Sequence, residues 1–265
     1  MLRQFVQSAI LRLGYNLRRR VATDRVAALL ARMQPVETRF ELVRLGGDDD
    51  GGYLVPDDLG ELKACFSPGV DRTASFEADI IKRGICCFLA DASVEGPPVS
   101  DPLIEFDKKF LGVVNDAQTT TLDAWVEDKL GKQPGGDLLL QMDIEGHEWA
   151  VLLNASDAVL QRFRIIVLEL HGLPHCFDEV TFNLFDACLD RLNRMFHVVH
   201  AHPNNATYPL RLGDLTIPYL LEITLLRRDR AEALGSVQKF PHRLDRPNVT
   251  DLPDLTLPAC LIGPS

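Results

Sequence analysis

Two apolar segments of the sequence end abruptly in residues that can carry protons or bind metal ions. The stretch "DLLLQMDIEGHEW" passes from an apolar run into Asp143 and His147, and the stretch "RIIVLELHGLPH" ends its apolar run with Glu169 and His171. Carboxylates and imidazoles supply general acids, general bases and ligands for divalent ions. If the two ends lie close together, they form one catalytic or metal-binding site.

The elements that must position these residues are apolar strands that alternate with helices from residue 62 onward. Near-continuous apolar strands separated by helices predict a parallel sheet that is covered on both faces. The final strand follows its predecessor without an intervening helix, so we expect it to be antiparallel. The predicted strands span 62–67, 85–91, 137–143, 163–170, 197–202 and 217–228, and the predicted helices span 22–34, 73–84, 119–131, 147–155 and 178–196.

Length and composition limit the classes of protein to consider. The chain has 265 residues, of which 46% are hydrophobic and 25% charged, as in an ordinary globular domain. No apolar run approaches the ~20 residues that a transmembrane helix needs. A formal net charge of −10 argues against nucleic acid as a partner. The six cysteines show no zinc-binding spacing, which favours reduced thiols in a cytoplasmic protein.

The sequence predicts three regions: an N-terminal helical extension at 1–36, a catalytic domain at 37–230 and an irregular C-terminal tail at 231–265. The first twenty residues carry five arginines and no acid, with apolar residues at helical spacing. A basic amphipathic helix of this kind can lie on an anionic membrane surface. The alternative, which we favour, is that its apolar face packs on the domain or on a second subunit.

Candidate ligand-binding residues follow the predicted strands, because open parallel sheets bind ligands beyond their carboxyl ends. Ser67 and Gly69 follow the first strand, and a glycine there lets the backbone approach a ligand closely. Asp91 ends the next strand and can accept hydrogen bonds from both ribose hydroxyls of a nucleoside cofactor. The segment "SPGVDRTASFE" lacks the glycine triplet that a dinucleotide pyrophosphate requires, which disfavours NAD.

These segments resemble a known family. "DLLLQMDIEGHEWAVLLNAS" is similar to the K-x-D-x-E-G-x-E segment of FkbM-type methyltransferases, and "TTTLDAWV", "RIIVLELH", "RLGGDDDGGYLVPDDL", "FSPGVDRTASFE" and "HAHPNN" resemble other segments of its members. The resemblance covers roughly residues 40–226. It implies a class I methyltransferase that uses S-adenosylmethionine. It also implies a Rossmann-like, mostly parallel seven-stranded sheet with an antiparallel last strand and helices on both faces.

The resemblance also implies roles for individual residues. Gly69 and Glu77 belong to the cofactor loop and the helix after it, with Ser67 beside them, and Asp91 contacts the ribose. Asp143 lies where the methionine end of the cofactor meets the substrate. Family members usually O-methylate sugars or other small hydroxylated molecules, so we expect a sugar, a glycan or a natural product as the substrate.

Methyl transfer to a hydroxyl requires a group that removes or weakens its proton, since an alcohol does not ionise unaided at neutral pH. A general base is one route. His171 is the first choice because it should face the same crevice as Asp143, and His147 and His202 are alternatives. A divalent metal such as Mg²⁺ or Mn²⁺ is the other route, with Asp143, Glu169, His171 and His202 as its ligands.

Other polar residues have weaker signals. Tyr53, Glu145, Asn204 and Asn205 are candidate substrate contacts, although the two asparagines also suit a turn. Glu148 is expected only to interact with the dipole of the helix that starts there. Two other functions stay open: a nicotinamide-dependent oxidoreductase, and a non-catalytic binding protein of the same fold.

Overall fold

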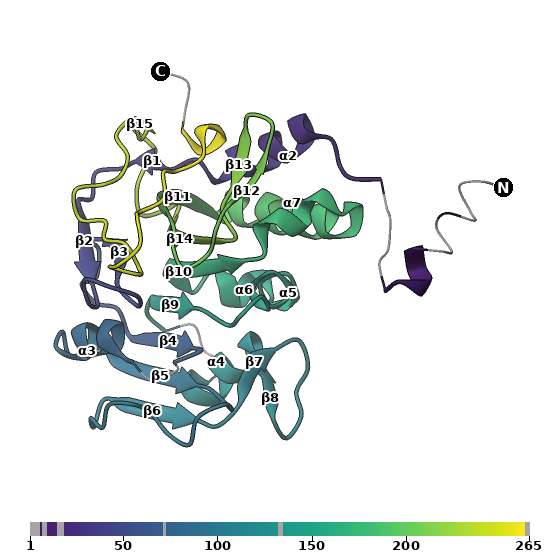
Figure 1. Ribbon diagram of the computed structural model, residues 1–265. Coiled ribbons are helices and arrows are strands. Elements are labelled where there is room, and N and C mark those ends of the chain that lie inside the picture. The colour runs from purple at the N-terminus through teal and green to yellow at the C-terminus, as the bar shows by residue number, and fades with distance from the viewer. Residues whose placement is uncertain (1–5, 7–9, 15–18, 71–72, 132–134, 263–265) are drawn as a thin grey trace.

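A seven-stranded sheet forms the centre of the protein, in the order β11-β14-β10-β9-β4-β5-β6 (Figure 1). The computed structural model describes residues 6, 10–14, 19–70, 73–131 and 135–262. The strands of this sheet are β4 (Ala64–Pro68), β5 (Cys86–Ala90), β6 (Ile104–Asp107), β9 (Leu138–Met142), β10 (Phe163–His171), β11 (Phe196–Pro203) and β14 (Leu220–Arg227). Pairing is parallel from β10 through β9, β4 and β5 to β6, and β14 is antiparallel to both β10 and β11. The predicted mixed α/β fold with a mostly parallel, Rossmann-like sheet is confirmed.

Helices connect the parallel strands, as parallel pairing requires. They are α2 (Thr23–Leu30), α3 (Ser75–Ile81), α4 (Leu122–Leu130), α5 (Glu148–Asn154), α6 (Asp157–Leu160) and α7 (Glu179–Met195), with short 3₁₀ turns η1 (Ala31–Met33), η2 (Leu173–Phe177) and η3 (Ala259–Leu261). The predicted threonine cap and glycine stop of α4 are confirmed. Thr121 accepts a hydrogen bond from the Ala124 amide at 3.3 Å, and Gly131 ends the helix with φ 71°.

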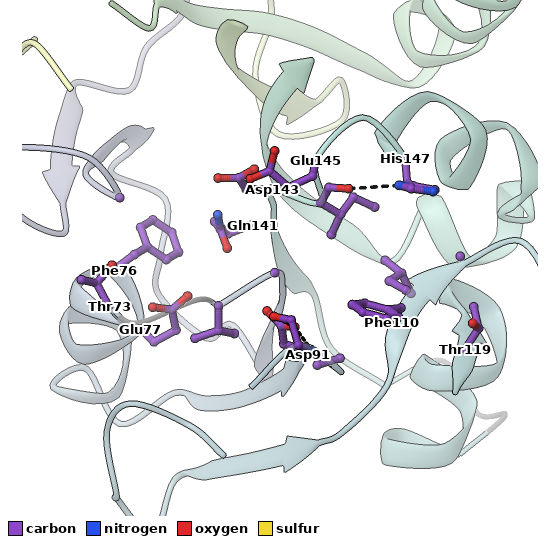
Figure 2. Close-up of a pocket in the computed structure, with 18 of the residues that line it drawn as sticks. Thr73, Phe76, Glu77, Asp91, Phe110, Thr119, Gln141, Asp143, Glu145 and His147 are labelled. Atoms are coloured by element: carbon purple, nitrogen blue, oxygen red, sulfur yellow. Dashed lines mark hydrogen bonds between the residues drawn. The ribbon is translucent and has the colours of Figure 1, made fainter. Parts of the chain in front are cut away.

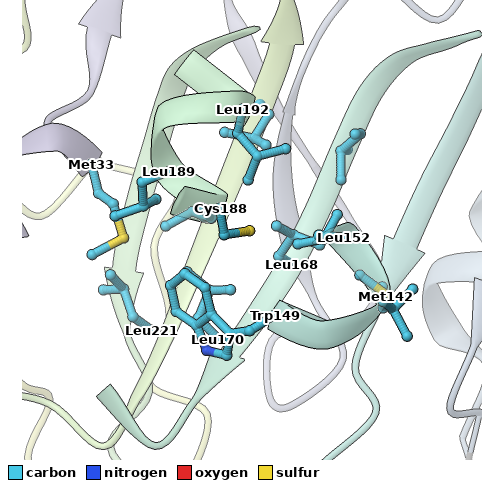
Figure 3. Packing of buried hydrophobic residues seen from close by; sticks show 14 of the residues in the cluster. Met33, Met142, Trp149, Leu152, Leu168, Leu170, Cys188, Leu189, Leu192 and Leu221 are labelled. Carbon is cyan, nitrogen blue, oxygen red and sulfur yellow. The ribbon is translucent and has the colours of Figure 1, made fainter. Parts of the chain in front are cut away.

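Alternating strand residues contribute to two apolar clusters, one on each face of the sheet. On one face Phe66 and Leu140 pack with residues of α2, α4, α5, α6 and α7. Figure 3 shows part of this cluster, where Trp149 of α5 and Leu189 of α7 lie over the sheet. On the other face Cys65 packs with α3 and with the β2–β3 hairpin. Packing on both faces therefore fixes the positions of the strands, and the carboxyl ends of the parallel strands form one edge of the sheet.

Four two-stranded ladders surround the main sheet. β2 (Leu42–Leu45) and β3 (Tyr53–Pro56) form an antiparallel hairpin whose connecting loop carries Asp50. β7 (Phe110–Gly112) pairs in parallel with β8 (Thr119–Thr121), β1 (Val36–Glu37) pairs with β15 (Gly235–Ser236), and β12 (Leu210–Leu212) pairs with β13 (Leu215–Ile217). The hairpin loop and β7 both reach the carboxyl edge of the sheet, where they border the site described below.

The two ends of the chain differ in how much of them the structure describes. Most of the predicted basic helix at 1–20 lies outside the described residues. The C-terminal tail passes over the ends of β11 and β14, where Asp245 pairs with His200 at 2.9 Å. Within the described ranges, no helix has the length and apolar character to span a bilayer.

Candidate functional site

A cavity of about 740 Å³ opens at the carboxyl ends of β4, β5 and β9 (Figure 2). Its wall combines acids, aromatic rings and small residues from the β2–β3 loop, α3, β7 and the segment after β9. The predicted site residues Tyr53, Gly69, Glu77, Asp91, Asp143, Glu145 and His147 all line it, together with Asp50, Thr73, Phe76, Phe110, Thr119 and Gln141, among others. The expectation that the strand ends share one crevice is therefore met for β4, β5 and β9.

Gly69 brings the loop after β4 against the end of β9. Its φ is +84°, a left-handed conformation, and a Cβ built on it would lie 1.6 Å from the Asp143 carbonyl oxygen. The Gly69 amide donates a hydrogen bond to the Ala90 carbonyl at 3.0 Å. Any side chain would push this loop away from β9. The glycine therefore keeps three strand ends close enough to border one ligand.

Asp91 lies directly after β5 on the cavity wall, and only 7% of it is exposed. Its Oδ1 accepts hydrogen bonds from the backbone amide of Ser93 at 2.7 Å and from the Ser93 hydroxyl at 2.6 Å. These two bonds fix the orientation of the carboxylate without help from a ligand. An acid oriented in this way at the end of the second parallel strand matches the requirement for binding a ribose diol.

Ser67, Glu77 and Gln141 form a buried polar group at the floor of the cavity. The Ser67 hydroxyl lies within hydrogen-bonding distance of Glu77 Oε1 and of Gln141 Oε1, the latter at 2.6 Å. One hydroxyl proton cannot serve both oxygens, so a proton on Glu77 would complete the group. Burial raises the pKa of Glu77, which favours that proton, although the hydrogen bonds from Ser67 and a backbone amide oppose it.

Gln141 was not among the predicted site residues. A polar residue inside the otherwise apolar run at 138–142 was the signal that could have found it. Figure 2 shows its side chain between Glu77 and Asp143. The cavity therefore has a continuous polar wall from the end of β4 to the end of β9.

Asp143, His171 and Glu148 form a charged group beside the cavity. His171 Nδ1 lies 3.1 Å from Glu148 Oε1, and its Nε2 lies 3.7 Å from Asp143 Oδ1 and 3.4 Å from Glu145 Oε2. His171 is not one of the residues that line the cavity, whereas Asp143 is. Asp143 Oδ1 is buried and has no hydrogen-bond partner. The imidazole thus stands behind a carboxylate that faces the cavity.

Glu148 was expected to act only through the helix dipole, but it has a larger structural role. It is fully buried, and its Oε1 accepts hydrogen bonds from the amides of Ile144 at 3.0 Å and Gly146 at 3.1 Å. It thereby fixes the turn in which Glu145 adopts a positive φ of 56°. Trp149, the next residue, donates its indole hydrogen to the His171 carbonyl at 3.2 Å. This last bond ties α5 to the end of β10.

The pKa values of Asp143 and His171 are both shifted, and as a result the two residues differ in charge at neutral pH. Burial raises the pKa of Asp143 to about 7, with the charges of Glu145, Glu148 and Asp50 adding to the rise and that of His171 opposing it. Burial lowers the pKa of His171, but the hydrogen bond to Glu148 and the charges of Glu148 and Asp143 outweigh it and raise the pKa to about 9. At neutral pH His171 is therefore protonated, and Asp143 exchanges between its two forms.

The comparison with known families agrees with this geometry. Residues 89–211 match the family model of the methyltransferase FkbM domain. This segment, a little under half of the chain, is similar to an FkbM methyltransferase domain. The match begins within β5, so it includes Asp91, Asp143 and His171, whereas Gly69 and Glu77 precede it. No curated protein matches the chain.

His147 and Tyr53 both line the cavity but differ in exposure. His147 is exposed, precedes α5, and has its Nδ1 3.3 Å from the Ile144 carbonyl oxygen. Tyr53 is buried, with its ring edge-on to Phe76 at a centroid distance of 5.8 Å. Glu145 projects from the turn with its side chain 89% exposed. His147 and Glu145 can therefore reach a ligand from the solvent side.

The remaining predicted residues of the binding and metal sets belong to a second polar cluster, next to the cavity. Glu169 accepts a hydrogen bond from Asn204 Nδ2 at 3.0 Å. His202 lies 3.7 Å from Glu222 and 3.3 Å from Asp254. Asn205 Nδ2 points to the carbonyls of residues 249, 252 and 253, and its Oδ1 accepts from the amide of residue 249. Asn205, a candidate substrate contact, thus holds the C-terminal tail.

The predicted metal ligands do not form one group, which corrects the predicted set. Among the described residues, two groups place three potential ligand atoms within 4.8 Å of one another: Asp143, Glu148 and His171, and Asp50, Glu169 and Glu222. The register explains the separation. Glu169 of β10 is paired with Glu222 of β14, and His202 of β11 lies on the far side of Glu222. Asp143 and His202 therefore contribute to different clusters.

Proposed function

We propose that this methyltransferase transfers a methyl group from S-adenosylmethionine to a hydroxyl of a small molecule such as a sugar, a glycan or a natural product. The observation that carries the proposal is the cavity whose wall has the oriented Asp91 at one strand end and Asp143 at another. The FkbM domain supports the methyl-transfer chemistry. The acceptor class and the assignment of individual roles are our proposal.

The residues on the cavity wall fit this cofactor. Gly69 leaves the loop after β4 free of any side chain, so a ligand can lie against its backbone. Asp91 accepts the ribose hydroxyls, and the apolar side chains of Phe110 and Leu111 offer a surface for a flat base. Asp143 and Gln141 border the methionine end. A positively charged sulfonium suits a wall that is rich in acids.

When bound, S-adenosylmethionine supplies an electrophilic methyl group. Asp143 then takes the role of general base, because it lines the cavity while His171 Nε2 lies 3.7 Å from its buried Oδ1. With a pKa of about 7, roughly half of its carboxylate is ionised at neutral pH, the range in which a base is most effective. Asp143 would accept the proton of the acceptor hydroxyl, whose oxygen would take the methyl group as the sulfur–methyl bond breaks and S-adenosylhomocysteine leaves.

In this proposal His171 positions and tunes Asp143 and does not itself accept the proton. Glu148 holds the His171 ring by its Nδ1, and the ring charge stabilises the ionised form of Asp143. Positioning of this kind supplies a large part of the rate in displacement reactions. His147, at the exposed side of the cavity, is placed to contact the acceptor.

Calorimetric titration with S-adenosylmethionine, S-adenosylhomocysteine and NADH tests the cofactor class. We expect micromolar binding of the first two and none of NADH. Binding of NADH alone would instead support a nicotinamide-dependent oxidoreductase and refute the proposal. Binding of S-adenosylmethionine without methyl transfer to any of a panel of sugars and polyols would favour a non-catalytic binding protein.

A further inference from the structure

Three carboxylates converge beside the cavity without enough positive charge to balance them. Asp50 comes from the β2–β3 loop, Glu169 from β10 and Glu222 from β14, and their oxygens lie within 4.8 Å of one another. Glu169 and Glu222 are 3% and 5% exposed. They are also directly paired across antiparallel strands, a position in which like charges repel.

The surrounding cations do not balance this charge. In the described part of the chain, neither Asp50 nor Glu169 has a Lys, Arg or His nitrogen within 4 Å, and Glu222 has His202 Nδ1 at 3.7 Å. Arg44 interacts with Glu222 through longer-range electrostatics, and its Nε lies 3.8 Å from Asp48 Oδ1. Buried carboxylates are costly unless they are paired or bind a metal.

Two other acids whose side chains are at most 10% exposed have close cationic partners. Asp58 is contacted by Arg230 at 2.8 Å and by Arg164 at 3.4 Å. Asp245, with its side chain 3% exposed, pairs with His200 at 2.9 Å. Glu169 differs from these two acids, because it is buried and has no cation within 4 Å among the described residues.

Asn248 of the C-terminal tail gives an independent indication of a ligand. It is 6% exposed, and its Nδ2 donates hydrogen bonds to Asp50 Oδ1 at 3.1 Å and to Glu222 Oε1 at 2.5 Å. Its Oδ1 is buried and has no hydrogen-bond partner. A half-turn of the amide would direct this oxygen at the same two carboxylates, which is favourable only if a cation lies between them.

We infer that Asp50, Glu169, Glu222 and Asn248 form a binding site for a hard divalent cation. The donors are all oxygens, which selects calcium, magnesium or manganese over zinc or copper. The three carboxylate oxygens lie within 4.8 Å of one another, so a single ion with oxygen ligands at about 2.0–2.6 Å can contact all of them. Asp50 is exposed and lines the cavity, which gives the cation a path of entry.

The test is calorimetric titration of the chelator-treated protein with Ca²⁺, Mg²⁺ and Mn²⁺ separately. We expect one ion per chain, with affinity weakened at least tenfold by Asp50→Asn and by Glu222→Gln. Glu145→Gln is the matched control, since it removes an exposed carboxylate outside the group and should change the affinity less than twofold. Asp50→Asn alone decides the matter if Glu222→Gln fails to fold, because Asp50 is exposed on a loop.

Asn248→Asp tests whether Asn248 is a ligand of the cation or only a hydrogen-bond donor to the carboxylates. A fourth carboxylate should tighten cation binding severalfold and make the thermal midpoint depend on the cation. Looser binding in this variant would contradict the inference. So would the absence of both heat and a thermal shift at millimolar ion, or binding that is lost in Asp143→Asn but retained in Asp50→Asn. The inference does not depend on the methyl donor, whose binding is measured separately with S-adenosylmethionine.

Discussion

Replacing Gly69 by alanine tests whether the close approach of two strand ends shapes the cofactor site. Gly69 has φ +84°, and a Cβ there would lie 1.6 Å from the Asp143 carbonyl oxygen. The left-handed conformation alone costs an alanine about 1–2 kcal/mol. The contact adds to this, because the loop or the end of β9 must move by roughly 2 Å to restore a normal separation. Forced displacement in a packed region typically costs another 1–3 kcal/mol.

Gly84 provides the matched control. It ends α3 with φ +75°, and a Cβ there would meet nothing within 4 Å. Gly84→Ala therefore has the cost of a left-handed backbone at an alanine but no steric clash. It should destabilise the protein by about 1 kcal/mol, because the lower conformational entropy of the unfolded chain offsets part of that cost. Gly69→Ala should cost about 2–5 kcal/mol, the sum of both terms.

Urea unfolding and calorimetry with S-adenosylmethionine measure the two effects. We expect Gly69→Ala to weaken binding of the methyl donor at least tenfold, since the displaced loop no longer borders the cavity, and Gly84→Ala to leave binding unchanged. Equal stability and equal affinity in the two variants would refute the account of Gly69, because the variants differ only in what the new methyl group meets.

Three further predictions follow from the site and the tail. Asp91→Ala should weaken binding of S-adenosylmethionine by about 1–3 kcal/mol in calorimetry, and unchanged affinity would show that the ribose lies elsewhere. The rate of methyl transfer should rise with pH through about 7 as Asp143 loses its proton. His171→Gln should move that rise to higher pH, because the charge of His171 lowers the pKa of Asp143, and an unmoved pH–rate profile would contradict the tuning role. Asn205→Ala should remove the hydrogen bonds from Asn205 to three tail carbonyls and cost about 1–3 kcal/mol. Limited proteolysis should then cut the tail faster, and an unchanged cleavage rate would argue against this role.

The sequence was most informative where strand pattern and chemistry coincide. Asp91 and Asp143 were identified because each ends an apolar run, and in a parallel sheet such ends meet at one edge. Both line the cavity. Gly69 followed from the same reasoning, although its reason for being glycine, the carbonyl of Asp143, could be seen only in three dimensions.

Glu148 shows what a one-dimensional pattern leaves out. An acid at the start of a helix suggests a favourable dipole interaction at the surface. Here the turn before α5 folds back over the side chain, so two amides and the His171 ring become its partners. These contacts depend on a strand more than twenty residues later. No local property of the sequence encodes the burial of this carboxylate.

The error in the metal set has a definite cause, which is strand order. The predicted set grouped Glu169 with His202 because both lie near strand ends, and the sequence does not give the order of the strands. β14 is instead inserted between β10 and β11, so Glu222 stands between Glu169 and His202 in the register. The insertion gives Glu169 a second carboxylate as its neighbour where an imidazole was expected. The carboxylates at this position therefore form an all-oxygen group, without the histidine that the predicted set contained.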